Sequence, residues 1–260
     1  MSYTLTCKDW KETLLAIREA SNLLGNPEKI WYRGQSNSTF ELKPSLFRVS
    51  GGLILESEMF RKFKQLDSRF GENSLDDWDI LYKMQHFGIP TRLLDWSEVV
   101  GVSLFFATKF NQLFENGQSI CLYALDPLKM NQKIFANHTQ IMTLSGKNNE
   151  RIQLDYVDTY LSNSNIPIVP IAIRPNKYNN NRILAQSGVF TVHPNTQNSL
   201  EKLCPECVVK IIINNSAIPE IVEILEITNV NDITIYPDMH GVAEYFRTLL
   251  SKECNSSIKI

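Results

Sequence analysis

The sequence is short of the features that mark membrane, secreted and nucleic-acid-binding proteins. Residues 1–9 contain no basic stretch followed by an apolar one, which a secretory signal needs. The longest uncharged apolar stretch, residues 99–107, is far shorter than the roughly 20 residues that cross a bilayer. Lys and Arg number 26 against 28 Asp and Glu, a net charge of −2, whereas nucleic-acid-binding proteins usually carry a basic face. We therefore expect a cytoplasmic globular protein with no membrane partner.

Cysteine is sparse, with five residues scattered along the chain. In a chain of this size without a secretory signal, they are expected to be reduced thiols. Cys204 and Cys207 have the spacing of a zinc knuckle, but no second Cys-x-x-Cys and no His pair lies at finger spacing. His193 is the only imidazole nearby. The sequence therefore predicts no metal site.

Several common enzyme motifs are also missing. The chain has no Gly-x-Gly-x-x-Gly, no Walker loop and no Gly-x-Ser-x-Gly. These absences argue against Rossmann, P-loop and α/β-hydrolase proteins. It also has no His-x-x-x-His and no cluster of paired carboxylates, so metal-dependent hydrolysis is not indicated.

What the sequence does have is a core-forming pattern over 260 residues, 43% of them hydrophobic. Apolar spacing and capping residues predict helices over 8–24, 59–70, 77–87 and 97–110. Runs of β-branched residues predict strands over 29–33, 119–125, 166–173, 188–193 and 208–213, with helices at 149–161, 196–203, 216–226 and 239–250. No linker separates the halves, so we predict a single α+β domain over residues 1–260, its helix-rich N-terminal half packed on a mixed or antiparallel sheet.

Three segments hold more polar residues than packing requires, and the first begins at Trp31. Arg33 ends an apolar strand and Gly34 follows it directly, which offers a fixed guanidinium beside accessible backbone. Arg33, Gly34 and Gln35 are therefore candidates to bind a phosphate or a carboxylate. The alternative is that Arg33 pairs with an acidic residue on a neighbouring helix.

The second segment places Gln85, His86, Thr91, Arg92 and Asp95 among residues that look buried. Buried polar groups need partners, so we expect one hydrogen-bond network. His86 is a candidate general base, with a satisfied core histidine as the alternative. Arg92 and Asp95 are expected to be largely structural. They lie three apart in an extended chain and should meet different partners, although a bracing pair between them is the other possibility.

In the third segment Gln186 enters a strand ahead of Gly188. Its neutral amide then lies at a strand edge, where it can bind a ribose or an amide. The alternative is that Gln186 only closes a turn that needs Gly188. Because polar groups at the ends of strands and helices commonly line a shared cleft, we predict one pocket. Its expected members are Arg33, Gln35, Gln85, His86, Arg92, Asp95 and Gln186.

Taken in order, these segments resemble the FRG domain, a prokaryotic family named for a Phe-Arg-Gly motif. The motif is Tyr32-Arg33-Gly34 here, followed by Pro44-Ser45-Leu46-Phe47-Arg48 and an acidic helix around Glu56 and Glu58. The most specific stretch is Gln85-His86-Phe87-Gly88-Ile89-Pro90-Thr91-Arg92-Leu93-Leu94-Asp95-Trp96. Residues 186–190 and 235–238 look like the closing blocks of the family, so the resemblance spans about residues 28–247.

The resemblance implies, by analogy of fold, a site like that of the ADP-ribosyltransferases, with NAD as the substrate and no metal. The catalytic residues it implies are Arg33 for the phosphates, Gln186 for the nicotinamide-side ribose, and His86. The implied NAD contacts are Arg33, Gly34, Gln35, Gln85, Thr91, Arg92 and Asp95. The sequence lacks the Glu-x-Glu or Gln-x-Glu pair of those enzymes, and Gln186 cannot ionise to act as a base.

Three functions remain open on this basis. The first is an NAD-consuming transferase or glycohydrolase of a toxin or phage-defence module, with a protein or nucleic acid as acceptor. The second is a domain that binds a nucleotide-like signal without turning it over. The third is nucleic-acid binding, which depends on local basic residues and must overcome the net charge of −2. These residues are Lys43, Arg48, Arg61, Lys62 and Lys64.

Overall fold

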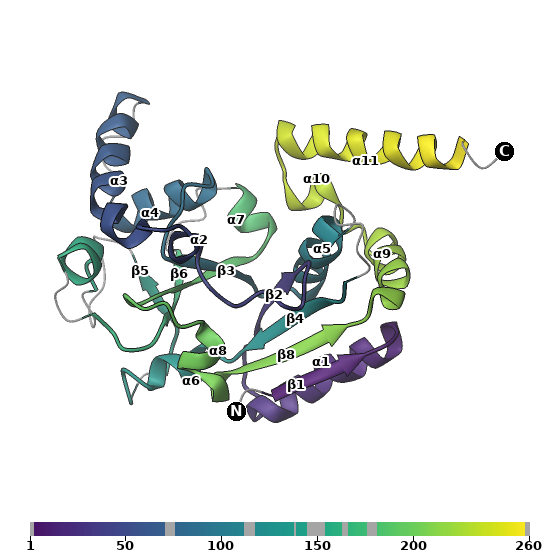
Figure 1. Cartoon of the computed structure of the whole chain (residues 1–260), viewed down its shortest axis with the longest axis horizontal. Helices are drawn as coiled ribbons and strands as arrows, with labels where there is room; N and C mark the ends of the chain where they lie inside the picture. Colours follow the sequence, from purple (N-terminus) through teal and green to yellow (C-terminus); the bar gives the residue numbers. More distant parts are fainter. Residues whose placement is uncertain are drawn as a thin grey trace.

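The chain forms one mixed sheet covered by helices (Figure 1). The computed structural model describes residues 3–70, 76–111, 118–137, 139–144, 154–162, 166–175 and 181–257. The strands are β1 (Tyr3–Cys7), β2 (Trp31–Gln35), β3 (Leu93–Ser97), β4 (Ile120–Leu125), β5 (Met142–Leu144), β6 (Ile171–Pro175), β7 (Gly188–Val192) and β8 (Val208–Ile213). Their order is β1-β8-β4-β2-β3-β7-β6-β5. Two pairs, β1 with β8 and β5 with β6, are parallel and the others antiparallel, so the predicted α+β class with a mixed sheet is confirmed.

The sheet splits at its centre. Strands β2 and β4 pair along five residues, and so do β3 and β7. In contrast, β2 and β3 meet at a single pair, Tyr32 with Ser97. Beyond that pair the two strands separate, and each half of the sheet continues as a four-stranded unit. The opening between β2 and β3 is where the site described below lies.

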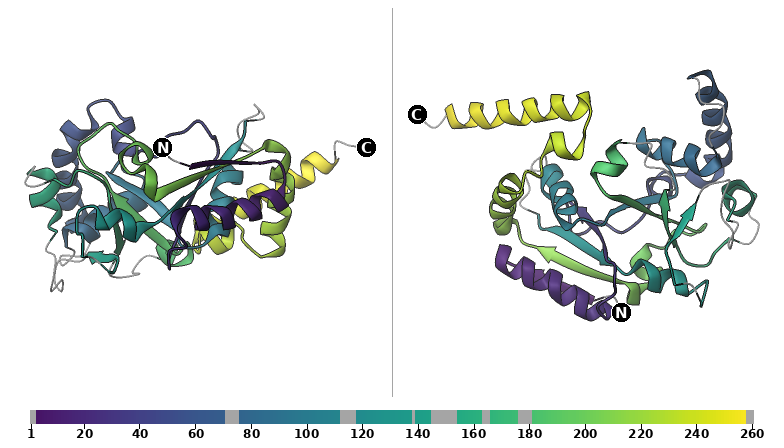
Figure 2. Two further views of the ribbon diagram at one scale, coloured as in Figure 1. Left: turned by 90° about the horizontal axis from the view of Figure 1, so that it is seen from below. Right: turned by 180° about the vertical axis from the view of Figure 1, so that it is seen from behind.

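Helices pack against each half of the sheet (Figure 2). The first half packs against α1 (Trp10–Leu24), α5 (Val100–Asn111) and α9 (Ile218–Ile227) in one apolar cluster. The second half packs against α3 (Gly52–Asp67), α4 (Asp77–His86) and the π-helical turn Val157–Leu161. The remaining helices are α2 (Ser45–Arg48), α6 (Pro127–Gln132), α7 (Asn181–Ala185), α8 (Leu200–Leu203), α10 (Asp232–Ile235) and α11 (Met239–Ser257), which projects from the body. None of the helices in the described part of the chain is long and apolar enough to span a bilayer.

Local signals explain most of these boundaries. Asp9 caps α1 by accepting a hydrogen bond from the Glu12 backbone N–H at 2.7 Å, and Asp76 caps α4 in the same way. Gly25 and Gly88, with φ of +93° and +74°, take the left-handed conformation that ends these two helices. The predicted helices 8–24 and 77–87 and the later strands are therefore confirmed to within a few residues.

Other expectations needed correction. The helix expected from residue 59 begins at Gly52, and the one expected from Ser97 begins at Val100 because Ser97 is the last residue of β3. The helix predicted over 196–203 shrinks to α8, and most of the one over 149–161 lies outside the described residues. Strand β1 was not predicted, although Tyr3, Leu5 and Cys7 alternate with two threonines there; most of its side chains are exposed. It is held by parallel pairing to β8, a contact across some 200 residues of sequence that no local pattern encodes.

A buried ion pair ties α3 to the start of β3. The Arg92 side chain is fully buried, and its Nε donates to Glu56 Oε1 at 2.7 Å while Nη2 bonds Glu56 Oε2. Arg92 Nη1 donates to the backbone oxygen of His193, and the Tyr156 hydroxyl donates to Glu56 Oε1 at 2.9 Å. All three nitrogens of this guanidinium thus bond to protein groups in the interior, and its assignment to the NAD site is wrong because the side chain is fully buried and does not line the cavity described below.

His193 lies fully buried beside this ion pair. Its Nε2 is 3.0 Å from the Thr191 hydroxyl. Burial, assisted by the positive charges of Arg92 and Arg33, lowers the pKa of His193 from 6.5 to about 3. The folded protein therefore holds this imidazole neutral across the physiological range.

The neutral His193 predicts a loss of stability in mild acid. The unfolded chain binds a proton at this histidine below pH about 6.5, whereas the folded chain does not until about pH 3. The free energy of unfolding should fall as the pH drops through this window, by about 1.4 kcal/mol per pH unit once below pH 6. Urea unfolding at pH 7.5, 6.0 and 5.0 measures this slope, and His193→Gln should flatten most of it. An equal slope in wild type and His193→Gln would contradict the assignment, and His240→Gln, at an exposed position, serves as the control imidazole.

Candidate functional site

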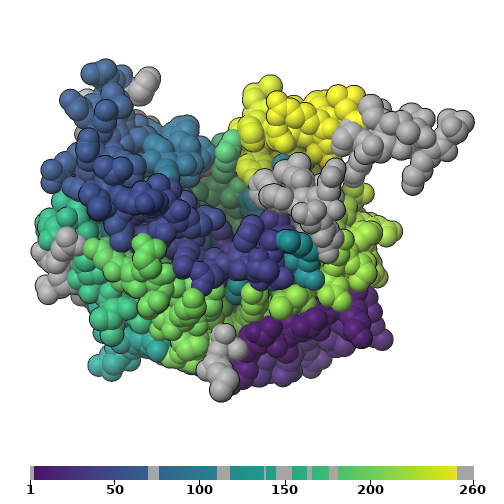
Figure 3. Space-filling view, viewed as in Figure 1, coloured from purple at the N-terminus to yellow at the C-terminus, as the bar shows by residue number. Residues whose placement is uncertain are grey.

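A cavity of about 440 Å³ opens where β2 and β3 separate. The floor comes from β2, β3 and β7, and the walls come from α4, α5 and α7. Its volume is in the range of small-molecule sites. Figure 3 shows the surface hollowed between the blue region of α3 and α4 and the yellow C-terminal helices, with α7 in the hollow.

The lining has an uneven chemistry. It contains three arginines, Arg33, Arg48 and Arg182. Its aromatic members are Tyr32, Phe40, Tyr82, Trp96, Phe106, Phe190 and Tyr236. Its amides are Gln35, Gln85 and Gln186. Asp95 is the sole carboxylate among the described residues that line the cavity. The site is thus cationic and aromatic, with one negative charge on its floor.

Most of the residues predicted to converge do so. Arg33, Gln35, Gln85, His86, Asp95 and Gln186 all line this cavity, although they span more than 150 residues of sequence. Arg92 is the exception for the reason given above. Thr91, which the resemblance assigned to NAD binding, is also buried with 1% of its surface exposed, so it cannot contact a ligand.

Arg33 bridges the two strands at the point where they separate. Its Nη1 donates to the backbone oxygen of Asp95 at 2.7 Å and lies 3.7 Å from Asp95 Oδ2. The alternative of an acidic partner on a helix is therefore wrong, because the partner is on the neighbouring strand. The Arg33 Nε is buried and has no hydrogen-bond partner. Burial lowers the pKa of Arg33, Asp95 opposes that effect, and Arg48 adds to it. The Arg48 guanidinium thus lies near that of Arg33, and both residues line the cavity.

Gly34 follows Arg33 in the strand and lets α5 approach. A Cβ atom at Gly34 would lie 1.8 Å from the backbone oxygen of Ser103. The predicted contact of Gly34 with a ligand stays a prediction, but helix packing by itself requires a glycine here.

Asp95 is held by a chain of hydrogen bonds from α4. The Thr91 hydroxyl donates to Gln85 Oε1, and Gln85 Nε2 donates to Asp95 Oδ2 at 2.8 Å. The Thr91 oxygen accepts in turn from the Leu93 backbone N–H at 3.1 Å. Asp95 is the exposed residue of an otherwise buried strand, with 53% of its side chain accessible.

The polar residues of this segment thus form two networks and not the single one expected. Thr91, Gln85 and Asp95 are linked on the pocket side, whereas Arg92, which precedes β3, belongs to the buried Glu56 cluster. The prediction of different partners for Arg92 and Asp95 is confirmed, and the alternative of a bracing pair between them is wrong.

The rim of the cavity is formed by residues from distant parts of the chain. Arg182 Nε lies 2.5 Å from Asp238 Oδ2, and its guanidinium carbon is 5.2 Å from the centre of the Tyr236 ring. Burial lowers the pKa of His86, and the nearby Arg182 adds to this while Asp238 opposes it. His86 is therefore favoured in its neutral form, and a base role for it remains a prediction.

Gln186 joins the rim to the floor. Its Nε2 donates to the backbone oxygen of Ile235 at 3.1 Å, and its own backbone oxygen accepts from the Ser97 hydroxyl at 2.7 Å. The left-handed residue of this turn is Ser187, with φ of +45°, and not Gly188, which lies in β7. The alternative of a turn that needs Gly188 is therefore wrong, and Gln186 orders the wall of the cavity.

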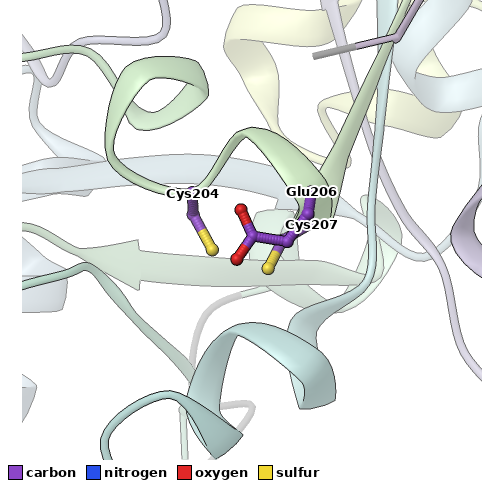
Figure 4. Close-up of side chains that lie close together, drawn as sticks. All are labelled: Cys204, Glu206 and Cys207. Atoms are coloured by element: carbon purple, nitrogen blue, oxygen red, sulfur yellow. The ribbon is translucent and has the colours of Figure 1, made fainter. Parts of the chain in front are cut away.

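A second polar cluster lies away from this cavity (Figure 4). Cys204 and Cys207 are fully buried, and with Glu206 they offer three donor atoms within 4.8 Å of one another. Glu206 supplies a third donor that cysteine spacing alone did not show. The Lys133 ammonium forms an ion pair with Glu206 and already places a positive charge there. The Cys204 side chain and burial raise the pKa of Cys207, so the thiol form is favoured over a metal-binding thiolate.

The chain is thus an α+β protein with a cavity at the split of its sheet, and one comparison with known proteins finds a match. Residues 28–116 match the family model described as the FRG domain. The predicted resemblance to the FRG domain family is therefore confirmed for this segment, which contains β2, β3, α4 and most of the pocket floor. That the domain extends over residues 1–260 remains a prediction. No curated protein and no solved structure matches the chain.

Several residues of the site were not singled out as ligand contacts from sequence. Arg48, Arg182 and Tyr236 each fell inside a segment noted for its resemblance or its polar content, but nothing local distinguished them from surface residues. Tyr32 was noted only as the ring of the Tyr-Arg-Gly motif. For Tyr236 the sequence did hold a signal, the resemblance of residues 235–238 to a closing block of the family. The Ile235 backbone oxygen in this block also accepts a hydrogen bond from the Gln186 side chain.

Proposed function

We propose that this cavity binds NAD or a closely similar dinucleotide, and that the protein breaks the N-glycosidic bond between nicotinamide and ribose. It would act as an NAD glycohydrolase or as an ADP-ribosyltransferase with a protein or nucleic-acid acceptor. The observation that carries the proposal is the lining itself, in which three arginines and several aromatic rings surround one carboxylate.

The cavity lining offers a suitable side chain for each chemical part of such a dinucleotide. The planar guanidinium of Arg33 has a buried Nε without a partner, and arginine is suited to the paired oxygens of a pyrophosphate. Tyr32 and Phe106 offer aromatic rings against which a flat heterocycle can stack. Gln35 and Gln186 add amides of the kind that bind ribose hydroxyls or a carboxamide.

The split between β2 and β3 supports the same conclusion. Ligand sites in sheet proteins commonly lie where neighbouring strands part, because backbone and side-chain groups from both strands face the opening. NAD consumption would deplete a cofactor that the whole cell shares. Such an activity suits a toxin or a phage-defence module that acts on the cytoplasmic pool.

Arg33→Lys is expected to keep the fold and to weaken NAD binding at least tenfold. Lysine preserves the aliphatic stem and the charge, but it cannot offer two donors in one plane to a pyrophosphate. Isothermal calorimetry with NAD measures the affinity, and the melting temperature checks the fold. The matched control is Arg247→Lys on α11, which lies away from the cavity and should bind like wild type. A folded Arg33→Lys protein with unchanged NAD affinity would contradict the proposed phosphate contact.

A further inference from the structure

Within the proposed function, which this inference rests on, the geometry points to Asp95 as the catalytic carboxylate, with Gln85 and Thr91 as its positioning residues. Breaking an N-glycosidic bond leaves positive charge on the ribose, and a fixed negative charge next to that sugar lowers the energy of the transition state. Asp95 is the carboxylate that the described lining offers for this purpose.

The placement of Asp95 is unusual for a surface acid. It occupies the middle of β3, where its neighbours in the strand are buried, yet half of its side chain opens to the cavity. Phe190 is paired with it across the sheet on β7 and offers no charge. An aspartate in a central strand is unfavourable for sheet formation, so the fold keeps a residue here that packing does not explain.

The carboxylate is also held in one orientation. Gln85 Nε2 donates to Oδ2, which leaves Oδ1 for a ligand. An amide side chain can turn end for end, and the Thr91 hydroxyl prevents this because it donates to the oxygen end of the Gln85 amide. The Thr91 oxygen is fixed in turn by the backbone N–H of Leu93. Thr91 is buried and cannot touch the substrate, so its influence on the reaction passes through Gln85.

The charges around Asp95 define the reaction it suits. The Arg33 guanidinium lies 3.7 Å from Asp95 Oδ2, and the Gln85 amide donates a hydrogen bond to the same oxygen. The substrate class is an N-riboside with a cationic leaving base. A carboxylate in contact with the sugar gains Coulomb energy as the positive charge moves from the base onto the ribose.

The step balances with water as the second substrate. The bond between C1′ and the pyridinium nitrogen breaks, and its electron pair neutralises the nicotinamide ring. A water molecule forms the new bond to C1′ and gives up a proton, which Asp95 accepts and returns to solvent. Nicotinamide, ADP-ribose and one proton account for all atoms of NAD and water. In transfer, a hydroxyl of the acceptor replaces the water.

The test compares variants for the rate of nicotinamide release from NAD and for NAD affinity. Asp95→Asn keeps the shape and the acceptor for Gln85 but removes the charge, so kcat should fall by about 100-fold or more. NAD affinity should change little. Glu98→Gln, three residues away and outside the cavity lining, is the control and should keep wild-type turnover.

A pair of substitutions at Thr91 separates positioning from packing. Thr91→Val has nearly the same shape without the hydroxyl, and Thr91→Ser keeps the hydroxyl with less bulk. The inference expects Thr91→Val to lower kcat about tenfold with KM nearly unchanged, and Thr91→Ser to stay close to wild type. A purely structural role gives the opposite order, and this pair decides the question even if Asp95→Asn fails to fold.

The outcomes distinguish this inference from the proposed function. If wild type releases nicotinamide and Asp95→Asn does so at the same rate, the assignment of Asp95 is wrong while the proposed function stands. If wild type neither binds NAD nor releases nicotinamide, the proposed function is wrong and the assignment is overturned with it.

Discussion

Glu56→Ala is expected to lower the free energy of unfolding by about 3–5 kcal/mol, the usual cost of removing one partner of a buried ion pair. The substitution leaves the Arg92 guanidinium buried without its carboxylate and deprives the Tyr156 hydroxyl of its acceptor. Because small domains have a total stability of about 5–15 kcal/mol, much of the protein should be unfolded well below the wild-type midpoint. Urea unfolding followed by circular dichroism measures the loss.

The same helix provides a control for this prediction. Glu58 lies two residues further along α3 and is exposed, so Glu58→Ala should change stability by less than about 0.5 kcal/mol. The double variant Glu56→Leu with Arg92→Met removes both charges and should recover much of the loss, since apolar replacements of a buried pair are often tolerated. Equal stability of Glu56→Ala and Glu58→Ala would show that the pair does not hold α3 to β3.

Gly34→Ala is expected to cost about 3 kcal/mol or more, at the upper end of the effects of overpacking. The new methyl group would lie 1.8 Å from the Ser103 backbone oxygen and 2.8 Å from its carbon. Backbone atoms cannot turn aside as a side chain does, so α5 must move away from β2. The cavity is formed by these two elements, and NAD binding should be lost together with the stability.

Alanine substitutions at two other glycines serve as controls, because they show the effect of alanine at sites where the added methyl group does not clash with backbone atoms. Gly101 lies on α5 itself, and a Cβ there would meet its nearest atom at an ordinary 3.6 Å. Gly101→Ala should therefore be neutral or slightly stabilising. Gly25 has open space but a φ of +93°, so Gly25→Ala should cost about 1–2 kcal/mol through backbone strain alone. A Gly34→Ala protein as stable as Gly101→Ala would contradict the close approach of α5.

The parts of the fold that the sequence predicted are those with local causes. The cap at Asp76 and the left-handed Gly88 together bound α4, and both are visible in a stretch of thirteen residues. Alternation along an extended chain placed Arg92 and Asp95 with different partners. It did not tell which of the two lines the cavity, because both are charged residues of one short segment and burial decides between them.

The parts that could not be predicted depend on contacts between distant segments. The split of the sheet depends on the register of Tyr32 with Ser97, which no pattern near either residue encodes. Glu56 is reached by Arg92 across 36 residues of sequence and by the Tyr156 hydroxyl across 100, so no local pattern could predict this cluster. For the same reason, Arg182 and Tyr236 entered the site only once α7 and α10 were placed beside it.

The most direct test of the account is to incubate the wild-type protein with NAD and to separate the products by chromatography over time. The account predicts that NAD disappears while nicotinamide accumulates in equal amount, with ADP-ribose either free or attached to an added protein or nucleic-acid acceptor. NAD that binds but remains intact would show a domain that only senses the nucleotide. Cleavage into AMP and nicotinamide mononucleotide would place the chemistry at the pyrophosphate, and either result would contradict the glycosidic reaction proposed for this pocket.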